Sequence, residues 1–183
     1  MFWLLLIPMS ASERELDLVA ETRRNWAKRG LSETEAMVAA TSLARAQQIT
    51  LGRINQALVE HGLTFSRYEA LALLSFARNQ SMGMSRVGER LQVHPTSVTS
   101  TIDRLERDGL VARTPNPNDR RSTLVALTTA GAEVLDKATA SLEAIRWGMG
   151  EIDDADLTTL IGALGQLRAS AGDVVHELSL IHI

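Results

Sequence analysis

Hydroxyl and arginine side chains gather on one side of the segment that begins at Pro95. If this segment is a helix, Val98, Ile102 and Leu105 fall within one narrow apolar arc. The other side carries Thr96, Ser97, Thr99, Ser100, Asp103, Arg104 and Arg107. Hydroxyl groups can bond to phosphates or base edges, and arginine can pair with guanine in the major groove of DNA. The alternative is an ordinary solvated helix face. The elements on either side of this segment discriminate between a DNA-binding face and a solvated one.

The neighbouring segments predict a short helix, a tight turn and a β-hairpin around this side. Residues 85–91 are expected to form a helix and residues 92–94 the turn, with Pro95 at the first position of the next helix. Residues 110–113 and 123–127 alternate like strands, and residues 115–119 are expected to be the turn between them. This order favours DNA over a solvated face. We expect the contacts to come from Ser85, His94, Thr96, Ser97, Thr99, Ser100, Arg104, Arg107, Arg120 and Arg121.

The charge balance allows such binding only through a local patch. The chain has 183 residues and a formal net charge of -3. Residues 85–128 contain seven basic and five acidic side chains, a balance of +2 that leaves -5 for the rest. Arg120 and Arg121 at the hairpin tip can reach an adjacent minor groove. A solvated turn is the alternative there.

The segment 98–111, VTSTIDRLERDGLV, and the hairpin after it resemble the multiple antibiotic resistance regulator (MarR) family of bacterial transcription factors. The wing motif of that family, D-x-R, five residues, L-T and then G, falls on Asp119, Arg121, Leu127, Thr128 and Gly131. The resemblance covers about residues 35–178. It implies a mainly α fold with a small β-hairpin wing, a winged helix-turn-helix with N- and C-terminal dimerisation helices. It also implies that Asp119 and Arg121 pair to brace the wing while Arg120 or Arg121 touches DNA.

The same resemblance implies a small-molecule effector and no other cofactor. Family members often bind a small aromatic or phenolic anion where the dimerisation helices meet the winged helix, and binding loosens DNA. The extra first helix resembles that of the urate-responsive subset, in which Trp26 and Glu69 would take two ligand-binding places. Alternatively, Glu69 forms a capping box with Ser66, and Trp26 packs on the core. Thr101 stands where that subset carries a cation, which argues against urate itself.

Two capping-box patterns predict helices before this centre. Ser12 with Glu15 opens a first helix that ends at Gly30. Ser32 with Glu35 opens a long helix with a near-heptad apolar stripe that ends at His61. Such a helix is too long for a small domain to bury alone.

Three more helices complete the prediction. Thr64 or Ser66 caps a third helix with the apolar residues Leu71, Leu73, Leu74 and Phe76. Thr128 or Thr129 caps another, which glycines 148 and 150 end. Asp153 or Asp154 caps the last, whose heptad stripe consists of Leu157, Leu160, Leu164, Leu167, Ala171, Val174 and Leu178. The stripe could be intramolecular core, but helices at both ends of a compact centre favour a homodimer.

These elements suggest four regions. Residues 1–11 are an apolar tail, expected to be disordered, and residues 12–62 hold the extra helix and the dimerisation helix. Residues 63–128 are the DNA-binding region, and residues 129–183 hold the C-terminal dimerisation helices. The apolar start is shorter than the roughly 17–25 residues of a membrane-spanning helix, so no membrane partner is expected and the location is predicted to be cytoplasmic.

The composition offers no chemistry for catalysis. The chain has no cysteine, and its 4 histidines lack metal-ligand spacing. No catalytic motif is present, so we expect neither an enzyme nor a metal site. The sequence thus predicts a ligand-responsive DNA-binding transcriptional regulator, a repressor, that binds a pseudo-palindromic operator as a homodimer. The alternative is a winged helix used only for protein interaction, which would lack the steep salt dependence of DNA binding.

Overall fold

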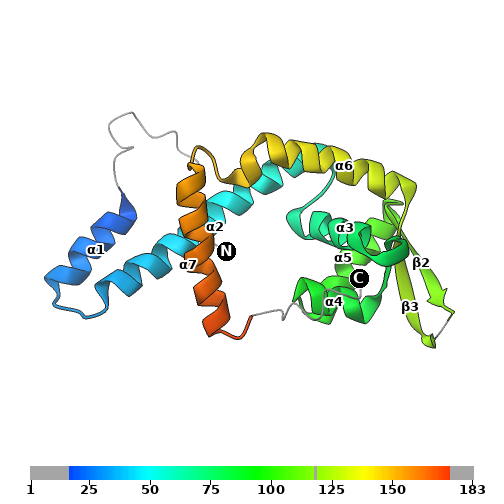
Figure 1. The fold of residues 1–183 in the computed structure, drawn as a ribbon, viewed down its shortest axis with the longest axis horizontal. Coiled ribbons are helices and arrows are strands. Elements are labelled where there is room, and N and C mark those ends of the chain that lie inside the picture. Colours follow the sequence, from blue (N-terminus) through cyan, green and yellow to red (C-terminus); the bar gives the residue numbers. More distant parts are fainter. Residues whose placement is uncertain (1–16, 118, 174–183) are drawn as a thin grey trace. The chain divides into compact units, whose positions relative to one another are not determined.

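The computed structural model describes residues 17–117 and 119–173, and of residues 95 and 119–121 it describes the backbone. The fold is mainly helical with one small antiparallel sheet, which confirms the predicted class (Figure 1). The helices are α1 (Leu18–Lys28), α2 (Thr34–Leu58), α3 (Phe65–Phe76), α4 (Met84–Leu91), α5 (Pro95–Arg107), α6 (Thr129–Ala144) and α7 (Asp154–Ser170). The strands are β1 (Ser81–Gly83), β2 (Val111–Asn116) and β3 (Asp119–Leu127). Short 3₁₀ turns are η2 (Val59–His61), η3 (Arg78–Gln80) and η4 (Arg146–Gly148).

The chain forms two compact units, residues 1–49 and 50–183, and α2 runs through the boundary between them. In the first unit, Asp17 stands just before α1, and its carboxylate accepts hydrogen bonds from the N–H groups of Val19 and Ala20 at 3.0 and 3.1 Å. The predicted capping pair Ser12 and Glu15 and the apolar tail lie outside the described residues. The side chain of Asp17 thus satisfies N–H groups in the first turn of α1, which is the role of an N-cap residue.

The predicted capping box of Ser32 and Glu35 is wrong. The helix α2 begins at Thr34, and Glu33 before it has a left-handed φ of 57°. The carboxylate of Glu35 accepts a short hydrogen bond from Arg23 on α1 instead of turning back to Ser32. An ion pair between the two helices thus replaces the local cap. The long helix itself is confirmed, and it continues through η2 to Gly62.

The second unit is built on one apolar core. Helices α3, α5 and α6 and the strands β2 and β3 contribute buried side chains, and the end of α2 joins them. The largest fully buried side chains are Leu58, Leu71, Leu74, Val87, Ile102, Leu105, Val125 and Leu142. Phe76 was expected with the apolar residues of α3, but it is 75% exposed because it stands in the last turn, where the helix leaves this core.

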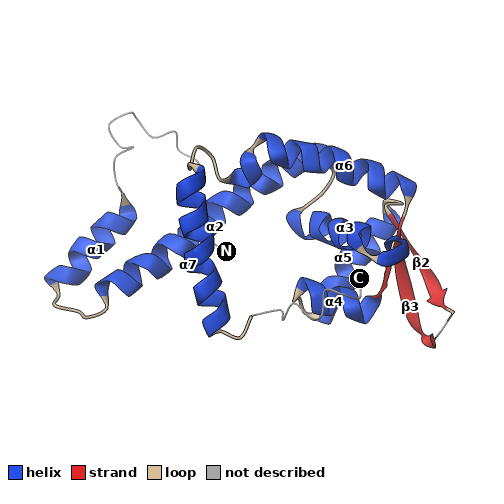
Figure 2. Ribbon diagram, in the orientation of Figure 1, coloured by secondary structure: helices blue, strands red, loops and turns tan. Residues whose placement is uncertain are grey.

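The sheet has a third strand that periodicity did not predict. The strand order is β1-β3-β2, and the three residues of β1 pair with Leu124–Ala126 of β3. Figure 2 shows the hairpin of β2 and β3. The hairpin is also longer than expected, because Pro115 pairs with Thr123 and Asn116 with Asp119. The predicted turn at residues 115–119 is therefore wrong at both ends, and only residues 117 and 118 lie between the strands. Since β2 is an edge strand, it tolerates the missing N–H of Pro115.

The last helix begins where the sequence predicted and ends earlier. Asp153 caps α7, and its carboxylate accepts a hydrogen bond from the N–H of Asp156 at 2.8 Å. The helix ends at Ser170, and Gly172 follows with a left-handed φ of 75°. The predicted heptad stripe is thus wrong at Ala171, which lies beyond the helix. Its last members, Val174 and Leu178, lie outside the described residues.

Candidate nucleic-acid interface

The helix α5 is fixed to the core by one face. Val98, Ile102 and Leu105 have exposed fractions of only 2%, 0% and 0%, as the sequence predicted. At the start of the helix, the Nδ1 atom of His94 accepts a hydrogen bond from the N–H of Thr96 at 3.3 Å. The predicted DNA residue His94 therefore has a structural role as the N-cap. Because its apolar face is buried, α5 presents its opposite face to solvent in a fixed orientation about the helix axis.

The exposed face of α5 carries the predicted polar residues. All six that were proposed for DNA on this helix are exposed: Thr96, Ser97, Thr99, Ser100, Arg104 and Arg107. Five of them, all except Ser97, share one open hollow with Asp103. Ser85, also exposed, lines the adjoining hollow between α4 and α5 together with Thr99. Ser97 lines a different hollow, described below.

A tight turn sets α4 against α5. Gln92 takes a left-handed φ of 53° and its N–H bonds to the carbonyl of Gly88, which ends α4. A Cβ at Gly88 would lie 3.2 Å from the Cγ2 of Val98, so the two helices pack with almost no space between them at this point. The angle at which α5 leaves α4 is thus set by the backbone.

One arginine of the wing holds two carboxylates of α5. The guanidinium of Arg113 on β2 donates to Asp103 Oδ1 at 2.6 Å and to Glu106 Oε2 at 2.5 Å. Its backbone N–H also donates to Glu106 Oε1 at 3.1 Å. Desolvation lowers the pKa of the Arg113 guanidinium, but the hydrogen bonds to Asp103 and Glu106 outweigh it and raise that pKa above its ordinary value. We call Arg113, Asp103 and Glu106 the wing clamp.

The wing clamp has two consequences for the exposed face of α5. It neutralises two negative charges beside Arg104 and Arg107, where an anionic partner would meet them. It also ties α5 to β2, the first strand of the wing. The sequence predicts Asp103 on the outward side of the helix but gives no signal for Arg113. The distance between Arg113 and Asp103 depends on how the hairpin folds back toward α5.

The wing motif also has a physical explanation at the base of the hairpin. The hydroxyl of Thr128 donates to the carbonyl of Gly109 at 2.8 Å and accepts from the N–H of Gly131 at 3.0 Å. A Cβ at Gly131 would collide with the carbonyl oxygen of Leu110 and lie 2.9 Å from the Cδ1 of Leu127. Leu127, Thr128 and Gly131 therefore bring the end of the wing, the start of α6 and the end of α5 to one point. Of the two predicted caps, Thr128 and Thr129, the helix uses Thr128.

The wing tip is described only by its backbone. Asp119, Arg120 and Arg121 belong to β3, at its beginning beside the turn. Their side chains lie outside the description, so the brace between Asp119 and Arg121 and the contact of Arg120 or Arg121 with DNA remain predictions. Together, the helix pair α4–α5 and the hairpin β2–β3 make a winged helix-turn-helix.

The two residues proposed for an effector belong to different units. Trp26 on α1 is half-buried, and its indole N–H donates to the carbonyl of Ser32 at 3.1 Å. Glu69 on α3 is exposed in part and lines a hollow of about 100 Å³ against α4 and α5, together with Ser97 and Thr101. Partial burial raises the pKa of the Glu69 carboxyl above its ordinary value. A joint pocket of Trp26 and Glu69 remains a prediction.

The alternative for Glu69, a capping box with Ser66, is not formed. Thr64 is the N-cap of α3, so Ser66 lies inside the helix. The hydroxyls of Thr64 and Ser66 are hydrogen-bonded to one another at 3.2 Å. Glu69 is therefore not explained by helix capping.

Metal and membrane sites were also considered for the part of the chain that the structure describes. There, His, Asp and Glu side chains do not gather in groups of three or more that could hold a metal ion. Among the helices described, none has both the length and the apolar character of a membrane span.

Comparison with known proteins places the chain in a family. The MarR family model matches residues 63–123. Sco5413, a MarR family transcriptional regulator from Streptomyces coelicolor, is 47% identical, with a TM-score of 0.72 over 78% of this chain and 99% of that one. The transcriptional regulator PrsX from Escherichia coli is 30% identical over 134 residues, which are 71% of this chain and 79% of PrsX. The chain therefore belongs to the MarR family, and these relatives are transcriptional regulators.

Two further comparisons have a narrower meaning. Sco3205 from Streptomyces coelicolor, a MarR family regulator solved in complex with DNA, matches with a TM-score of 0.68 over 75% of this chain and 87% of that one, but at 21% identity the likeness shows the fold alone. The chain spans about half the length of the first curated relatives it matches. It covers 49% of YkoM and 57% of the transcriptional repressor MdtR, both from Bacillus subtilis, at 38% and 34% identity. What the whole protein binds is therefore treated below as a proposal.

Proposed function

We propose that this protein is a transcriptional regulator that binds a pseudo-palindromic DNA operator as a homodimer. The observation that carries the proposal is the exposed face of α5, where hydroxyl and guanidinium groups stand on a helix whose other face is buried. Hydroxyl and arginine side chains on a helix of this kind match the phosphates and base edges of a major groove. Family membership supports the same conclusion, and such a regulator would work in the cytoplasm.

The homodimer is supported by apolar side chains that the chain leaves exposed. No residue of α7 is buried, and Ile161 and Leu167 are 69% and 54% exposed. In the other unit, Leu43 and Ile49 on α2 are 40% and 41% exposed. Rows of exposed apolar residues on long helices are typical of surfaces that another subunit covers.

The operator follows from the symmetry of a dimer. Two copies of α5 related by a two-fold axis would read two half-sites about one helical turn, roughly 10 bp, apart. Selection of bound sequences from random duplexes, followed by footprinting, tests this spacing. Full affinity for a single asymmetric half-site would contradict it.

The helix and the wing are expected to have different roles. Arg104→Ala should lose about 1–3 kcal/mol at particular base pairs, the usual size of a base contact. Arg120→Ala should weaken all sites alike, because a hairpin tip meets phosphates or the minor groove rather than the major-groove code. Binding of each variant to a panel of single-base operator mutants measures both effects. The roles would be reversed if Arg120→Ala changed base preference and Arg104→Ala did not.

The alternative function is protein interaction without sequence-specific DNA binding. DNA binding through phosphates should weaken steeply as salt rises, since counterions are released on binding. We expect the logarithm of the operator affinity to fall linearly with the logarithm of the salt concentration. A chain that shows no preference among duplexes and no salt dependence would be an interaction module.

We further propose that the regulator is a repressor released by a small aromatic anion near Trp26 and Glu69. The name of the relative MdtR as a repressor supports the first part. An effector that prefers the DNA-free form about 100-fold would supply about 2.7 kcal/mol of coupling. Titration of Trp fluorescence with phenolic and purine anions, with and without operator and repeated on Trp26→Phe, tests it. Equal affinity for free and DNA-bound protein would contradict the switch.

A further inference from the structure

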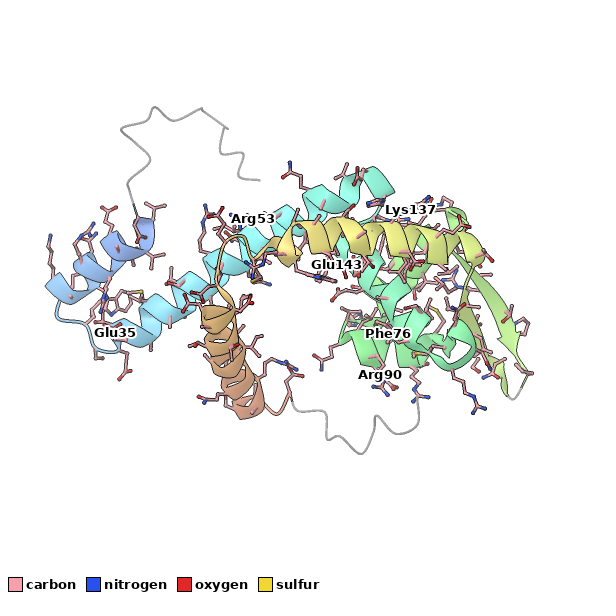
Figure 3. The ribbon with its side chains drawn as sticks, turned by 45° about the horizontal axis from the view of Figure 1, so that its top comes forward. Glu35, Arg53, Phe76, Arg90, Lys137 and Glu143 are labelled. Carbon is pink, nitrogen blue, oxygen red and sulfur yellow. The ribbon has the colours of Figure 1, made fainter. Side chains whose placement is uncertain are left out.

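A second surface of the winged helix lies apart from the exposed face of α5. It is a pocket of about 310 Å³ between the end of α3, the strand β1 and the helix α4. Leu73, Phe76 and Met82 form apolar walls. Figure 3 shows Phe76 and Arg90, both of which line the pocket, near one another. Among the side chains that the structure describes, none of those expected to contact DNA lines it, so a partner here would not compete with DNA for the same groups.

Positive charge is concentrated in this pocket. Arg78, Arg86 and Arg90 line it, whereas no aspartate or glutamate belongs to the described lining. None of these three guanidiniums takes part in an ion pair with another described residue. Arg86 and Arg90 are four residues apart on α4 and so share a face of that helix, while Glu89 lines the hollow toward α5. We call this surface the arginine pocket, and its unpaired charges favour an anionic partner.

The rim of the arginine pocket is open to solvent. Phe76 is 75% exposed, more than any other large apolar side chain that the structure describes, and Arg78 and Arg86 are exposed as well. Sites for small molecules bury roughly 70–90% of the surface of their ligand, which a pocket with such an exposed wall does not offer. A partner that brings its own surface to the pocket can cover the phenyl ring from outside. The shape therefore favours a macromolecule over a small ligand.

The composition of the lining favours a protein over DNA. The centres of protein interfaces are enriched in aromatic residues, methionine and arginine, and they are depleted in lysine, aspartate and glutamate. The described lining follows this pattern, because it contains Phe76, Met82 and three arginines but none of the depleted types. DNA phosphates would engage the arginines alone and would leave the apolar walls in water, since phosphate contacts come from polar and charged groups.

We propose that the arginine pocket is the docking surface for an acidic segment of a partner protein. An apolar side chain of the segment would enter beside Phe76 and Met82 and displace water from both. Carboxylates on either side of that anchor would pair with Arg86 and Arg90 through charge-assisted hydrogen bonds. This interaction is separate from the proposed operator binding, and one subunit can hold both partners because the two surfaces share no described side chain that we expect to contact DNA.

The experiment is a selection of binders to the full chain from a library of random displayed peptides, without DNA. We expect the selected peptides to carry aspartate or glutamate around one aromatic or aliphatic residue. A selected peptide is then synthesised with a fluorescent label, and its affinity is measured by anisotropy. An uncharged match, with asparagine and glutamine in place of the acids, should bind at least about tenfold more weakly.

Variants of the full chain locate the peptide. The double variant with Arg86→Gln and Arg90→Gln should weaken the selected peptide at least about tenfold, and Phe76→Ala should weaken it about tenfold. Lys137→Gln removes an exposed cation from α6, and Val59→Ala shortens a side chain that is 71% exposed outside the pocket. Both controls should leave the affinity unchanged. Thermal unfolding of each variant verifies that it folds.

The outcomes separate this proposal from the others. Selection of no acidic peptide, or equal binding by the natural chain and the double arginine variant, would overturn it. If the double variant lost operator affinity while no acidic peptide bound the natural chain, the arginines would be phosphate contacts instead. Because the selection contains no DNA, a failure of the proposed operator binding would leave the peptide result intact.

Discussion

Helices α5 and α7 both carry apolar residues at helical spacing, but they bury them to different extents. On α5, Val98, Ile102 and Leu105 are 0–2% exposed and belong to the core of the winged helix. On α7 no residue is buried, and Ile161 is 69% exposed. The first helix is held by its own chain, whereas the second leaves Leu160, Ile161 and Leu167 exposed to solvent.

The difference shows what an apolar stripe can and cannot establish. A repeat of three or four residues predicts that one side of a helix will be covered, but not by which chain. The core of the winged helix lies among α3, α5, α6 and the sheet, so α5 is complete without a partner. The exposed apolar side chains of α7 are those that we expect a second subunit to cover. Comparing equal substitutions on the two helices makes this difference measurable.

The largest effect is expected from Ile102→Ala. Removal of a fully buried isoleucine side chain should lower the free energy of unfolding by about 2–5 kcal/mol, because a cavity remains in the core. Urea denaturation followed by circular dichroism measures the loss. A change below about 0.5 kcal/mol would mean that α5 does not depend on its buried face.

The same substitution on α7, Ile161→Ala, should act on association instead. If a second subunit covers this side chain, its removal should raise the dimer dissociation constant by about tenfold, which corresponds to about 1.4 kcal/mol. Sedimentation equilibrium over a range of protein concentrations measures the constant. A chain that is monomeric at micromolar concentration with intact helicity would contradict the role assigned to α7.

The winged helix was predictable from sequence because its signals are local. The apolar spacing in α5, Pro95 at its first turn and Thr128 as the cap of α6 each lie within a few residues of what they determine. By contrast, β1 has only three residues. It is a strand because it pairs with residues 124–126, more than forty positions later in the chain. No local pattern signals such a strand.

The parts of the site that escaped prediction depend on distant partners. The sequence predicts Glu35 as part of a local cap, but its carboxylate accepts a hydrogen bond from Arg23 on another helix. The bonds of Arg113 to Asp103 and Glu106 depend on the path of the hairpin, so local sequence patterns do not predict them. Which charged side chains form ion pairs depends on how the helices and strands pack against one another. The periodicity of apolar residues along one helix does not predict that pairing.

An intermediate effect is expected from Arg113→Gln in the wing clamp. The substitution frees the carboxylates of Asp103 and Glu106 beside Arg104 and Arg107, so it should weaken operator binding about tenfold by repelling phosphates. Fluorescence anisotropy with an operator duplex at two salt concentrations measures the loss, which should be larger at low salt.

Neutralising the freed carboxylates provides the control for the wing clamp. The triple variant with Arg113→Gln, Asp103→Asn and Glu106→Gln should recover most of the lost affinity. Lys137→Gln, which removes an exposed charge from α6, should have no effect. If the triple variant bound DNA as weakly as Arg113→Gln alone, Arg113 would contact DNA directly rather than act through the two carboxylates.

The smallest effect is expected from Glu69→Gln, in the hollow between α3 and α5. Partial burial raises the pKa of the Glu69 carboxyl above the ordinary 4.5 in the folded state. Below that ordinary value the carboxyl is neutral in both the folded and unfolded states, and desolvation costs nothing. As the pH rises through the folded-state pKa the carboxyl ionises, and the folded state loses stability relative to a neutral side chain.

Glu69→Gln should therefore stabilise the protein slightly at neutral pH and not at all in acid. The gain should be small, since Glu69 is exposed in part and solvent screens its charge. Urea denaturation at a series of pH values, with Glu143→Gln on the exposed side of α6 as a match, measures the difference. A loss of stability at neutral pH would show that the Glu69 carboxylate has a cationic partner. The hollow beside α5 would then be a charged contact like the wing clamp, rather than an unfilled space against α5.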